Sequence, residues 1–325
     1  MVPVATVVPD LADRVAREVA AAVGRDDVRV DLVPLSAGAS RETYRVTATA
    51  DDGWSGAYIL QKERSGPTLG VTAVEEQVRL LAAVAGVPVP AVVAWDGGDR
   101  LGAPFLLTGL VEGETLPRRI LRAPELAAAR AGFAAQCGQI LGRLHATPLA
   151  GLSWLDVTDQ LDRVVGWLDE IGEPHPAFEI AIAWLRANRP GPVEPVLVHG
   201  DFRTGNLIIG QDGVRAVLDW EMTHVGDPAE DLAWLCVKVW RFRGPGVVGG
   251  MGDVADLLGA YAEETGREIE QARLFWWQVF GTLKWGVICE KQASTHLSGE
   301  YRSVELAAIG RRVCETEYDL LRMLP

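Results

Sequence analysis

The sequence predicts an α+β fold, in which a small sheet near the N-terminus precedes a larger and mainly helical part. Three β-prone segments, residues 28–33, 42–48 and 57–62, follow one another early in the chain. Beyond residue 113 apolar residues recur at helical spacing, most clearly over residues 126–144. With 325 residues, the chain can bury a sizeable core as one large or two modest domains.

The first element is a predicted amphipathic helix. Its apolar face is formed by residues that recur every four positions after Asp10, a good N-cap residue: Leu11, Val15, Val19 and Val23. We expect this helix to pack its apolar face against the N-terminal sheet.

The predicted strands carry two features of chemical interest. A turn of small residues, which includes Gly38, Ala39 and Ser40, joins the first two strands. In the third strand, the period of two places Lys62 on the same face as Leu60. A lysine on a cleft-facing strand can pair with phosphates, although a solvent-exposed lysine is the commonest alternative.

A second helix is predicted over residues 72–85 from its apolar stripe. It carries Glu75 and Glu76, and either carboxylate could hold Lys62. Residues 102–113 then form a predicted apolar strand that runs into a glycine-punctuated connector.

The C-terminal region combines tryptophan-rich helices with a glycine-rich loop. Aromatic residues at helical spacing are usually core, which is the reading that the spacing favours for five of them: Trp234, Trp240, Trp276, Trp277 and Trp285. Residues 244–252 contain five glycines and one proline, which predicts a mobile loop that could act as a lid.

A hairpin is predicted where two β-prone runs, residues 207–209 and 214–218, flank Asp212-Gly213. With that pair as the turn, Asn206 stands opposite Asp219, at roughly 4.5 to 5.5 Å and on the same face. An amide oxygen and a carboxylate at that separation can share one hard cation. Asp201 would lie in the loop before the hairpin, where it can accept a proton from a hydroxyl group.

Ordinary turn chemistry is the alternative explanation, because Asp and Asn are common in turns. Against it, Asp201, Asn206 and Asp219 keep the spacing of a phosphoryl-transfer loop followed by its metal-binding aspartate. His199 and Gly200 complete that loop. The spacing therefore favours a catalytic site.

At these residues the chain resembles the aminoglycoside phosphotransferase and choline kinase family, which comprises small-molecule kinases. The resemblance rests on His199-Gly200-Asp201-Phe202, Gly226-Asp227-Pro228 and Asp231-Leu232-Ala233-Trp234. Leu218-Asp219-Trp220-Glu221-Met222 is most similar to the phosphotransferase-like branch related to kinase domains associated with acyl-CoA dehydrogenases. The resemblance covers most of the chain, and its specific motifs lie between residues 196 and 235.

The resemblance implies a two-lobed, protein-kinase-like fold. A nucleotide-binding lobe would span residues 1–108, and a catalytic and acceptor-binding lobe residues 109–325. The implied activity is ATP-dependent phosphorylation of a hydroxyl group on a small molecule. Asp201 would be the base, and Asn206 and Asp219 would hold Mg²⁺.

The resemblance also implies the nucleotide contacts. Lys62 would clamp the phosphates with Glu76 as its partner, because Glu76 precedes Leu80 by four residues as in the family. Backbone groups are expected to face the phosphates or the adenine at five positions: Gly38, Ala39, Ser40, Gly109 and Val111.

Four further polar residues are expected to be structural. His145 and His199 would orient the catalytic loop through hydrogen bonds, and neither is expected to carry a proton in the reaction. Asp227 and Asp231 would anchor a loop and a helix, because Gly-Asp-Pro is a good turn and helix start.

Composition narrows the classes of partner. The formal charge of −13 and the pI of about 4.9 argue against nucleic acid and anionic membrane. No apolar run reaches membrane-spanning length and the N-terminus lacks a signal-peptide core, so we expect a cytoplasmic protein. The four cysteines are widely spaced without a metal-ligand pattern, and we expect buried reduced thiols.

Two questions stay open at the level of sequence. Residues 234–240 and 274–285 are rich in tryptophan and poor in carboxylates, which favours a neutral or partly apolar acceptor over an aminoglycoside. The alternative to an enzyme is a nucleotide-binding pseudokinase or regulatory module without transfer, because only Gly38 stands where protein kinases carry several glycines.

Overall fold

The computed structural model describes residues 9–37, 41–63 and 73–325, which fall into two compact units. The first unit takes in the described residues up to Val84 together with Pro88–Gly113 and Arg215–Glu221. The second consists of Ala85–Val87, Glu114–Val214 and Met222–Pro325. The predicted division into domains after residue 108 stays a prediction.

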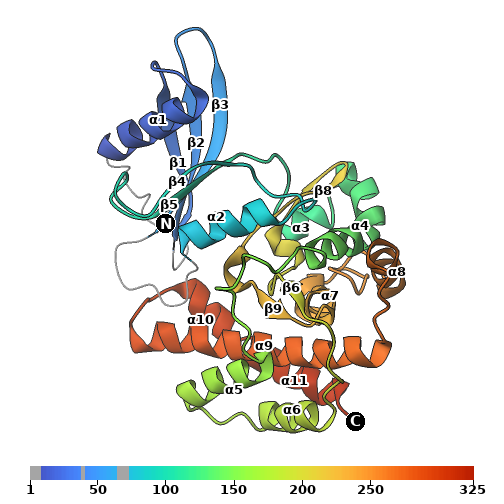
Figure 1. The fold of residues 1–325 in the computed structure, drawn as a ribbon. Coiled ribbons are helices and arrows are strands. Elements are labelled where there is room, and N and C mark those ends of the chain that lie inside the picture. Colours follow the sequence, from blue (N-terminus) through green and yellow to red (C-terminus); the bar gives the residue numbers. More distant parts are fainter. Residues whose placement is uncertain (1–8, 38–40, 64–72) are drawn as a thin grey trace. The chain divides into compact units, whose positions relative to one another are not determined.

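The first unit is built on an antiparallel five-stranded sheet in the order β1-β2-β3-β5-β4 (Figure 1). Its strands are β1 (Arg29–Ala37), β2 (Arg41–Thr49), β3 (Ser55–Glu63), β4 (Val92–Asp96) and β5 (Phe105–Gly109). Its helices are α1 (Pro9–Val23) and α2 (Val74–Ala83). All three strands predicted near the N-terminus are present, and so are both helices.

The core of this unit lies between α1 and the sheet. Val15 and Val19 of α1 are completely buried, and they pack in one cluster with Leu60 of β3 and Phe105 of β5. The burial of these valines confirms the predicted apolar face of the first helix. It stabilises the unit, because it removes apolar surface from water.

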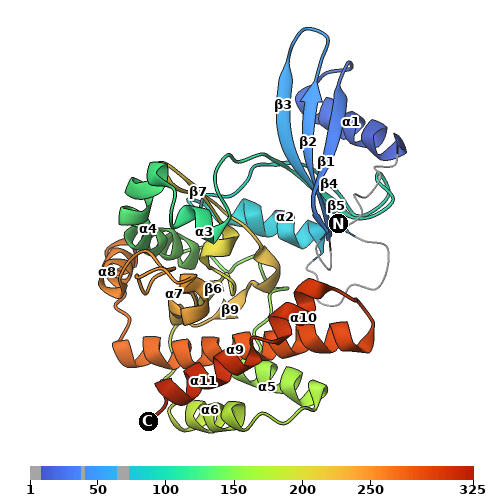
Figure 2. The same ribbon diagram turned by 180° about the vertical axis from the view of Figure 1, so that it is seen from behind.

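The second unit is mainly helical, and the long helix α9 (Gln271–Ser298) runs through it (Figure 2). The other helices are α3 (Pro117–Ile120), α4 (Ala127–His145), α5 (Gln160–Ile171), α6 (Pro176–Ala187), α7 (Ala229–Cys236), α8 (Val254–Thr265), α10 (Val304–Gly310) and α11 (Val313–Met323). Helix α9 contacts α5, α6, α7, α10 and α11. An N-terminal antiparallel sheet and a larger helical part confirm the predicted α+β class.

Four short strands form two small sheets, β6 with β9 and β7 with β8. Their bounds are β6 (Val196–Val198), β7 (Leu207–Gly210), β8 (Gly213–Val217) and β9 (His224–Gly226). The predicted hairpin is therefore present, but its turn is Gln211-Asp212, one residue earlier than expected. Gly213 belongs to β8 and has a φ of 117°, which glycine adopts without strain.

The glycine-rich segment over residues 244–252 is packed, which corrects the expectation of a mobile lid. Backbone bridges pair Gly246 with Gly250, and the Gly249 N–H donates to the Leu235 carbonyl oxygen at 3.0 Å. A Cβ at Gly249 would collide with the Thr204 hydroxyl and the Phe133 ring. These glycines therefore serve close backbone packing.

The cysteine prediction holds in part. Cys137, Cys236 and Cys289 are buried free thiols, whereas Cys314 is exposed.

Helices α4 and α8 approach closely at Gly138, and this contact gives a stability prediction. A Cβ at Gly138 would overlap the Leu257 carbonyl oxygen and press on Ala260. We expect Gly138→Ala to lower the free energy of unfolding by about 1–3 kcal/mol, because the packed helices cannot yield without strain. Chemical denaturation followed by circular dichroism measures the change.

Gly132, on the same helix, provides the matched control. A Cβ at Gly132 meets no atom within 4 Å. Gly132→Ala should therefore stabilise the protein by roughly 0.5–1 kcal/mol through helix propensity. Equal effects of the two substitutions would contradict the close packing of α4 on α8.

Candidate active site

The loop that follows β6 holds the Asp201 carboxylate with three side-chain donors. Asp201 Oδ1 accepts hydrogen bonds from Trp234 Nε1 at 2.8 Å and from Arg203 Nε at 3.0 Å. Asp201 Oδ2 accepts one from Asn206 Nδ2 at 2.6 Å. The sequence predicted the neighbourhood of Asp201 and Asn206 but not the roles of Arg203 and Trp234. The orientation of the carboxylate is therefore fixed from three directions.

Asn206 is fixed with its amide oxygen turned away from Asp201. Its Nδ2 donates to the Asp201 backbone oxygen at 3.0 Å as well as to the carboxylate. Both partners are acceptors, so only the nitrogen can face them. Among the described residues, Asn206 Oδ1 has no hydrogen-bond partner. The loop thus presents a neutral oxygen of the kind that hard cations bind.

Arg203, which belongs to the same loop as Asp201, contacts a cluster of tryptophans. Its guanidinium carbon is 4.6 Å from the centre of the Trp240 ring, in cation–π contact. The Trp240 ring in turn packs on Trp234 and Trp285, with ring centres 5.2 and 4.8 Å apart. Gly205 leaves room for this arrangement, because a Cβ there would strike Arg203 Nη1.

Asp231 anchors the loop that follows β6 to α7. Its carboxylate is fully buried and accepts the backbone N–H groups of His199 at 2.7 Å and of Gly200 at 2.9 Å. His145 Nε2 lies 3.3 Å from the same carboxylate, while its Nδ1 pairs with the Tyr261 hydroxyl at 3.0 Å. The anchoring role expected for Asp231 and the structural role expected for His145 are confirmed.

Burial alone would raise the pKa of Asp231, because an anion loses its hydration. The hydrogen bond and charge of His145, together with the charge and backbone N–H of His199, outweigh that effect. The pKa of Asp231 is therefore lowered, and the carboxylate stays ionised at neutral pH.

A second buried network supports the loop from α9. Lys284 Nζ donates to the Gly200 carbonyl oxygen at 2.9 Å and lies 3.2 Å from Glu230 Oε1. The other oxygen of Glu230 is 3.0 Å from His224 Nε2. Sequence reasoning missed Lys284, although a lone lysine within an apolar helix segment was a usable signal.

Gly200 shows why glycine stands between His199 and Asp201. Its φ is 80°, in the left-handed region, and a Cβ there would collide with the Met222 carbonyl oxygen. The backbone therefore turns sharply, which lets His199 Nδ1 accept the Asp201 N–H at 3.1 Å. This contact agrees with the loop-orienting role expected for His199.

Asp219 follows β8 with a φ of 66°, in the left-handed region that Asp tolerates better than most residues. Asn206 ends the 3₁₀ turn η2 (Thr204–Asn206), and Asp219 lies between β8 and the 3₁₀ turn η3 (Trp220–Met222), so neither residue belongs to a strand. By this division Asn206 is in the second unit and Asp219 in the first. Their joint binding of a metal stays a prediction.

The first unit contains the predicted phosphate clamp. Lys62 Nζ lies 3.9 Å from Glu42 Oε2 on the neighbouring strand β2. Glu75 pairs with Arg79, and among the described residues Glu76 makes no ion pair. The pairing of Lys62 with Glu76 stays a prediction.

Sequence reasoning missed another cation of this unit, Arg41. Its Nη1 donates to Gln77 Oε1 of α2 at 2.8 Å, and its Nε lies 3.8 Å from Glu221 Oε1. Arg41 thus joins the start of β2 to the turn that follows Asp219.

Of the other predicted nucleotide contacts, only Gly109 and Val111 lie within the described residues. Gly38, Ala39 and Ser40 lie outside the described residues. The Gly109 N–H donates to the Ala91 carbonyl oxygen at 2.8 Å. Val111 has no hydrogen-bonded backbone partner within the described part of the chain.

A family model for the phosphotransferase enzyme family matches residues 31–275 of the sequence, which is more than half of the chain. The chain belongs to this family.

Relatives of this phosphotransferase-family chain include a much longer protein. Acyl-CoA dehydrogenase family member 10 from Mus musculus is 31% identical over 229 residues, which cover 65% of the chain and 20% of the relative. The chain thus spans about a fifth of that relative's length. Membership of the family supports a small-molecule phosphotransferase activity.

Solved structures share the fold. The apoenzyme of a macrolide 2′-phosphotransferase from Brachybacterium faecium gives a TM-score of 0.61 at 23% identity, over 95% of this chain and 98% of that one. An aminoglycoside phosphotransferase in ternary complex with AMP-PNP and hygromycin B also gives 0.61, at 15% identity, over 96% of this chain and 99% of that one.

Two negative findings concern the described part of this family member. Within residues 9–37, 41–63 and 73–325, no three His, Cys, Asp or Glu side chains gather as a metal-binding group. In the same part, every helix is too short or too polar to cross a membrane.

The ionised Asp231 gives a prediction about acid stability in this phosphotransferase-family chain. Its lowered pKa means that the carboxylate stabilises the fold above the unfolded value of about 3.9 and stops doing so as the pH falls through the folded value. We expect Asp231→Asn to lower the free energy of unfolding at pH 7 by about 3 kcal/mol. Between pH 7 and pH 4 the wild-type advantage should persist, and it should shrink below that range.

Denaturant unfolding over this pH range makes the measurement. Asp169→Asn is the matched control, because Asp169 is exposed on α5 and has no partner in the described part of the chain. A wild-type advantage over Asp231→Asn that stays constant down to the most acid pH would contradict an ionised, stabilising Asp231.

Proposed function

We propose that the protein catalyses ATP-dependent phosphorylation of a hydroxyl group on a small molecule. The observation that carries this proposal is the Asp201 carboxylate, held by Arg203, Asn206 and Trp234 within one loop. A carboxylate fixed in this way can orient an acceptor hydroxyl and receive its proton. Phosphoryl transfer requires little more from a protein than positioning and charge neutralisation.

The residues fit a magnesium ion. Among the described residues, the Asn206 amide oxygen has no hydrogen-bond partner, and Asp219, whose own φ is 66°, has a carboxylate side chain. Both are the hard oxygen ligands that Mg²⁺ prefers, usually with waters and substrate phosphates as its other ligands. When bound, Mg²⁺ would neutralise charge on the phosphates. We assign it to Asn206 and Asp219.

Arg203 and Asp201 would act as a pair. Arg203 Nε occupies both carboxylate oxygens of Asp201, at 3.0 and 3.2 Å, while the ring of Trp240 fixes the guanidinium plane. The acceptor oxygen would approach the exposed side of Asp201 and attack the γ-phosphorus. Its proton would pass to Asp201 as the bond to ADP breaks.

The remaining contacts would hold the nucleotide. Lys62 would bind the phosphates, with Glu76 as its partner once the nucleotide is present. Backbone groups at Gly38, Ala39 and Ser40 would face phosphate. At the adenine, Val111 is the better donor, because the Gly109 N–H is already bound to Ala91 and leaves that residue only its carbonyl.

The acceptor is proposed to be neutral or partly apolar. Tight recognition of several ammonium groups would need carboxylates that are not already neutralised by buried partners. Near Asp201, Glu230 is paired with Lys284 and His224, and Asp231 accepts backbone N–H groups, which supports the proposal that neither carboxylate is available to an ammonium group. The nearby Trp234 and Trp240 belong to a buried apolar cluster.

Acceptor-dependent release of ADP tests the proposed function. The purified chain is incubated with Mg·ATP and a panel that contains hydrophobic alcohols, hydroxyacids, sugars and kanamycin-type aminoglycosides. We expect little ADP without acceptor and stoichiometric phosphorylation of a neutral or apolar hydroxyl compound, seen by mass spectrometry. Efficient turnover of aminoglycosides alone would show that the acceptor class is wrong. Tight nucleotide binding without turnover of any acceptor would instead indicate a binding module.

Two substitutions separate the proposed roles within the site. Asp201→Asn keeps the size of the side chain but cannot take a proton, so kcat should fall roughly 10²- to 10⁴-fold with nearly unchanged affinity for Mg·ATP. Asp219→Asn should instead weaken Mg·ATP binding. Calorimetry and steady-state kinetics give the two quantities. An Asp201→Asn variant with wild-type kcat would refute the assignment of Asp201.

A further inference from the structure

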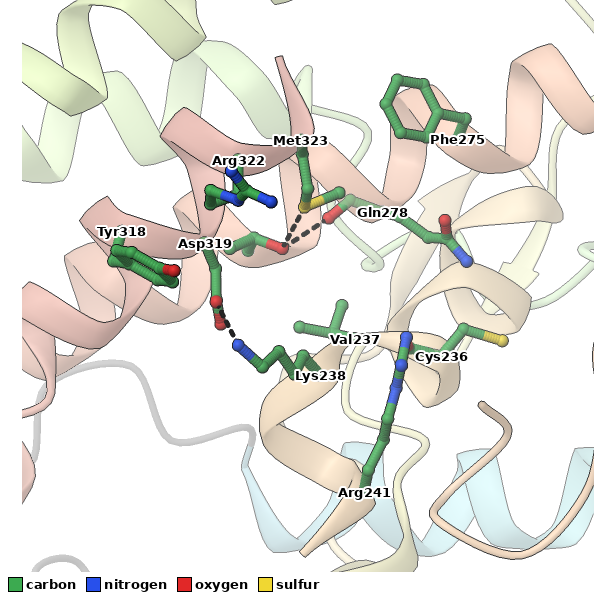
Figure 3. Close-up of a pocket in the computed structure, with 11 residues that line it drawn as sticks. Cys236, Val237, Lys238, Arg241, Phe275, Gln278, Tyr318, Asp319, Arg322 and Met323 are labelled. Atoms are coloured by element: carbon green, nitrogen blue, oxygen red, sulfur yellow. Dashed lines mark hydrogen bonds and ion pairs between the residues drawn. The ribbon is translucent and has the colours of Figure 1, made fainter. Parts of the chain in front are cut away.

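The second unit contains a pocket of about 420 Å³ that is separate from the catalytic loop (Figure 3). Its walls come from the end of α7, from the 3₁₀ turn η4 (Lys238–Arg241), from α9 and from α11. Pockets of this size hold small organic ligands.

The cations of the pocket exceed its anions. Lys238, Arg241 and Arg322 line it with one carboxylate, Asp319, so its formal charge is +2 in a chain whose net charge is −13. Asp319 is bound to Lys238, as Figure 3 shows. The two guanidinium groups are therefore left without a compensating carboxylate in the described part of the chain.

Each guanidinium has donors to spare. Within the described part of the chain, Arg241 makes one hydrogen bond, from Nη2 to the Cys236 carbonyl oxygen at 3.0 Å. Arg322 is exposed on α11 and has no partner among the described residues. Arginine presents its donors in a planar fork that matches carboxylate and phosphate oxygens.

The nearest thiol does not neutralise Arg241. Burial raises the pKa of Cys236 to about 12, against the lowering effects of the Arg241 charge and a hydrogen bond with Gln278. Cys236 is therefore a neutral thiol at physiological pH, and the positive charge of the pocket remains.

Beneath the cations, the pocket is apolar. Cys236 and Val237 are almost completely buried in its floor, and the rings of Phe275 and Tyr318 stand at its sides (Figure 3). The pocket thus combines apolar and cationic side chains in its lining, which suits a ligand of mixed character.

A second pocket of nearly equal size lacks this combination of apolar side chains and unpaired cations. It measures about 390 Å³ and is lined by Trp276 and Trp277, so these tryptophans border a pocket as well as the core. Its one cation, Arg189, is paired with Asp159, and Asp227 and Glu230 line it too. That pocket has no uncompensated cation among its lining residues.

We propose that the cationic pocket binds a small organic anion with an aromatic or apolar body, whose carboxylate or phosphate group lies against Arg241 and Arg322. The apolar body would rest on Val237 between Phe275 and Tyr318. Binding there requires neither ATP nor the acceptor hydroxyl.

The pocket and the catalytic loop share one structural element. Lys238 and Arg241 of η4 line the pocket, while Trp240 of the same turn packs against Arg203 and Trp234. A ligand that contacts Arg241 therefore lies on the same 3₁₀ turn as Trp240, whose ring packs against Trp234. We expect its binding to change tryptophan emission.

Titration with phenyl phosphate and benzoate tests the proposal, with calorimetry and tryptophan fluorescence as readouts. Both anions should saturate the site, and the neutral analogue benzyl alcohol should bind far more weakly. Arg322→Gln, in an exposed side chain that should not affect folding, is expected to weaken both anions by ~10-fold or more. Arg241→Gln should do the same.

Controls distinguish this pocket from the nucleotide site. Arg186→Gln removes the same charge from an exposed arginine on α6 and should leave the affinities unchanged. Saturating Mg·ATP and Asp201→Asn should also leave them unchanged. Wild-type affinity in Arg322→Gln, equal binding of benzyl alcohol or of inorganic phosphate, or no saturable binding at millimolar concentration would each overturn the proposal.

Discussion

The loop from His199 to Asn206 depends on one buried anion. The Asp231 carboxylate has no contact with water, so its charge must be satisfied by donors, and two of these are backbone N–H groups of His199 and Gly200. A buried carboxylate therefore fixes the backbone immediately before Asp201. The left-handed turn at Gly200 follows from the same requirement, because both amides must point at one carboxylate. The position of Asp201 is thereby set by a residue of α7.

The side chain of Asp201 is fixed by a different set of contacts. Trp234 belongs to α7, as Asp231 does, and its indole N–H donates a hydrogen bond to the Asp201 carboxylate. Lys284 of α9 holds the Gly200 carbonyl from the other side and lies 5.0 Å from the Trp234 ring. Backbone and side chain of the loop are thus held by one helix pair, α7 and α9. Such rigid support is what a positioning catalyst requires.

Local patterns predicted much of this architecture. The strands around Lys62, the amphipathic α1 and the loop from His199 to Asn206 follow from periodicity and spacing, which are properties of neighbouring residues. Lys284 could not be placed in the same way, because it lies 84 residues after Gly200 and only the packing of α9 brings it there. Arg203 was within reach of sequence reasoning, since it stands two residues after Asp201.

Glycine was the least reliable signal. A run of glycines was read as chain mobility, yet at Gly249 and Gly250 the missing side chain makes room for Phe133, Thr204 and the Arg241 backbone. Composition cannot distinguish freedom of φ from close approach, because both require the absence of Cβ. The hairpin turn differs from the prediction for a related reason. Gly213 has a positive φ but is the first residue of β8, so the turn consists of Gln211 and Asp212.

Net charge misleads in the same manner, because it averages over surfaces that act separately. The value of −13 describes the field far from the molecule, where it disfavours polyanions. Within the second unit, however, Arg203 and Lys284 lie at the catalytic loop, and Arg241 and Arg322 lie at the pocket behind η4. The 3₁₀ turn η4 separates these two groups of cations, because its Trp240 packs against Arg203 while its Arg241 lines the pocket.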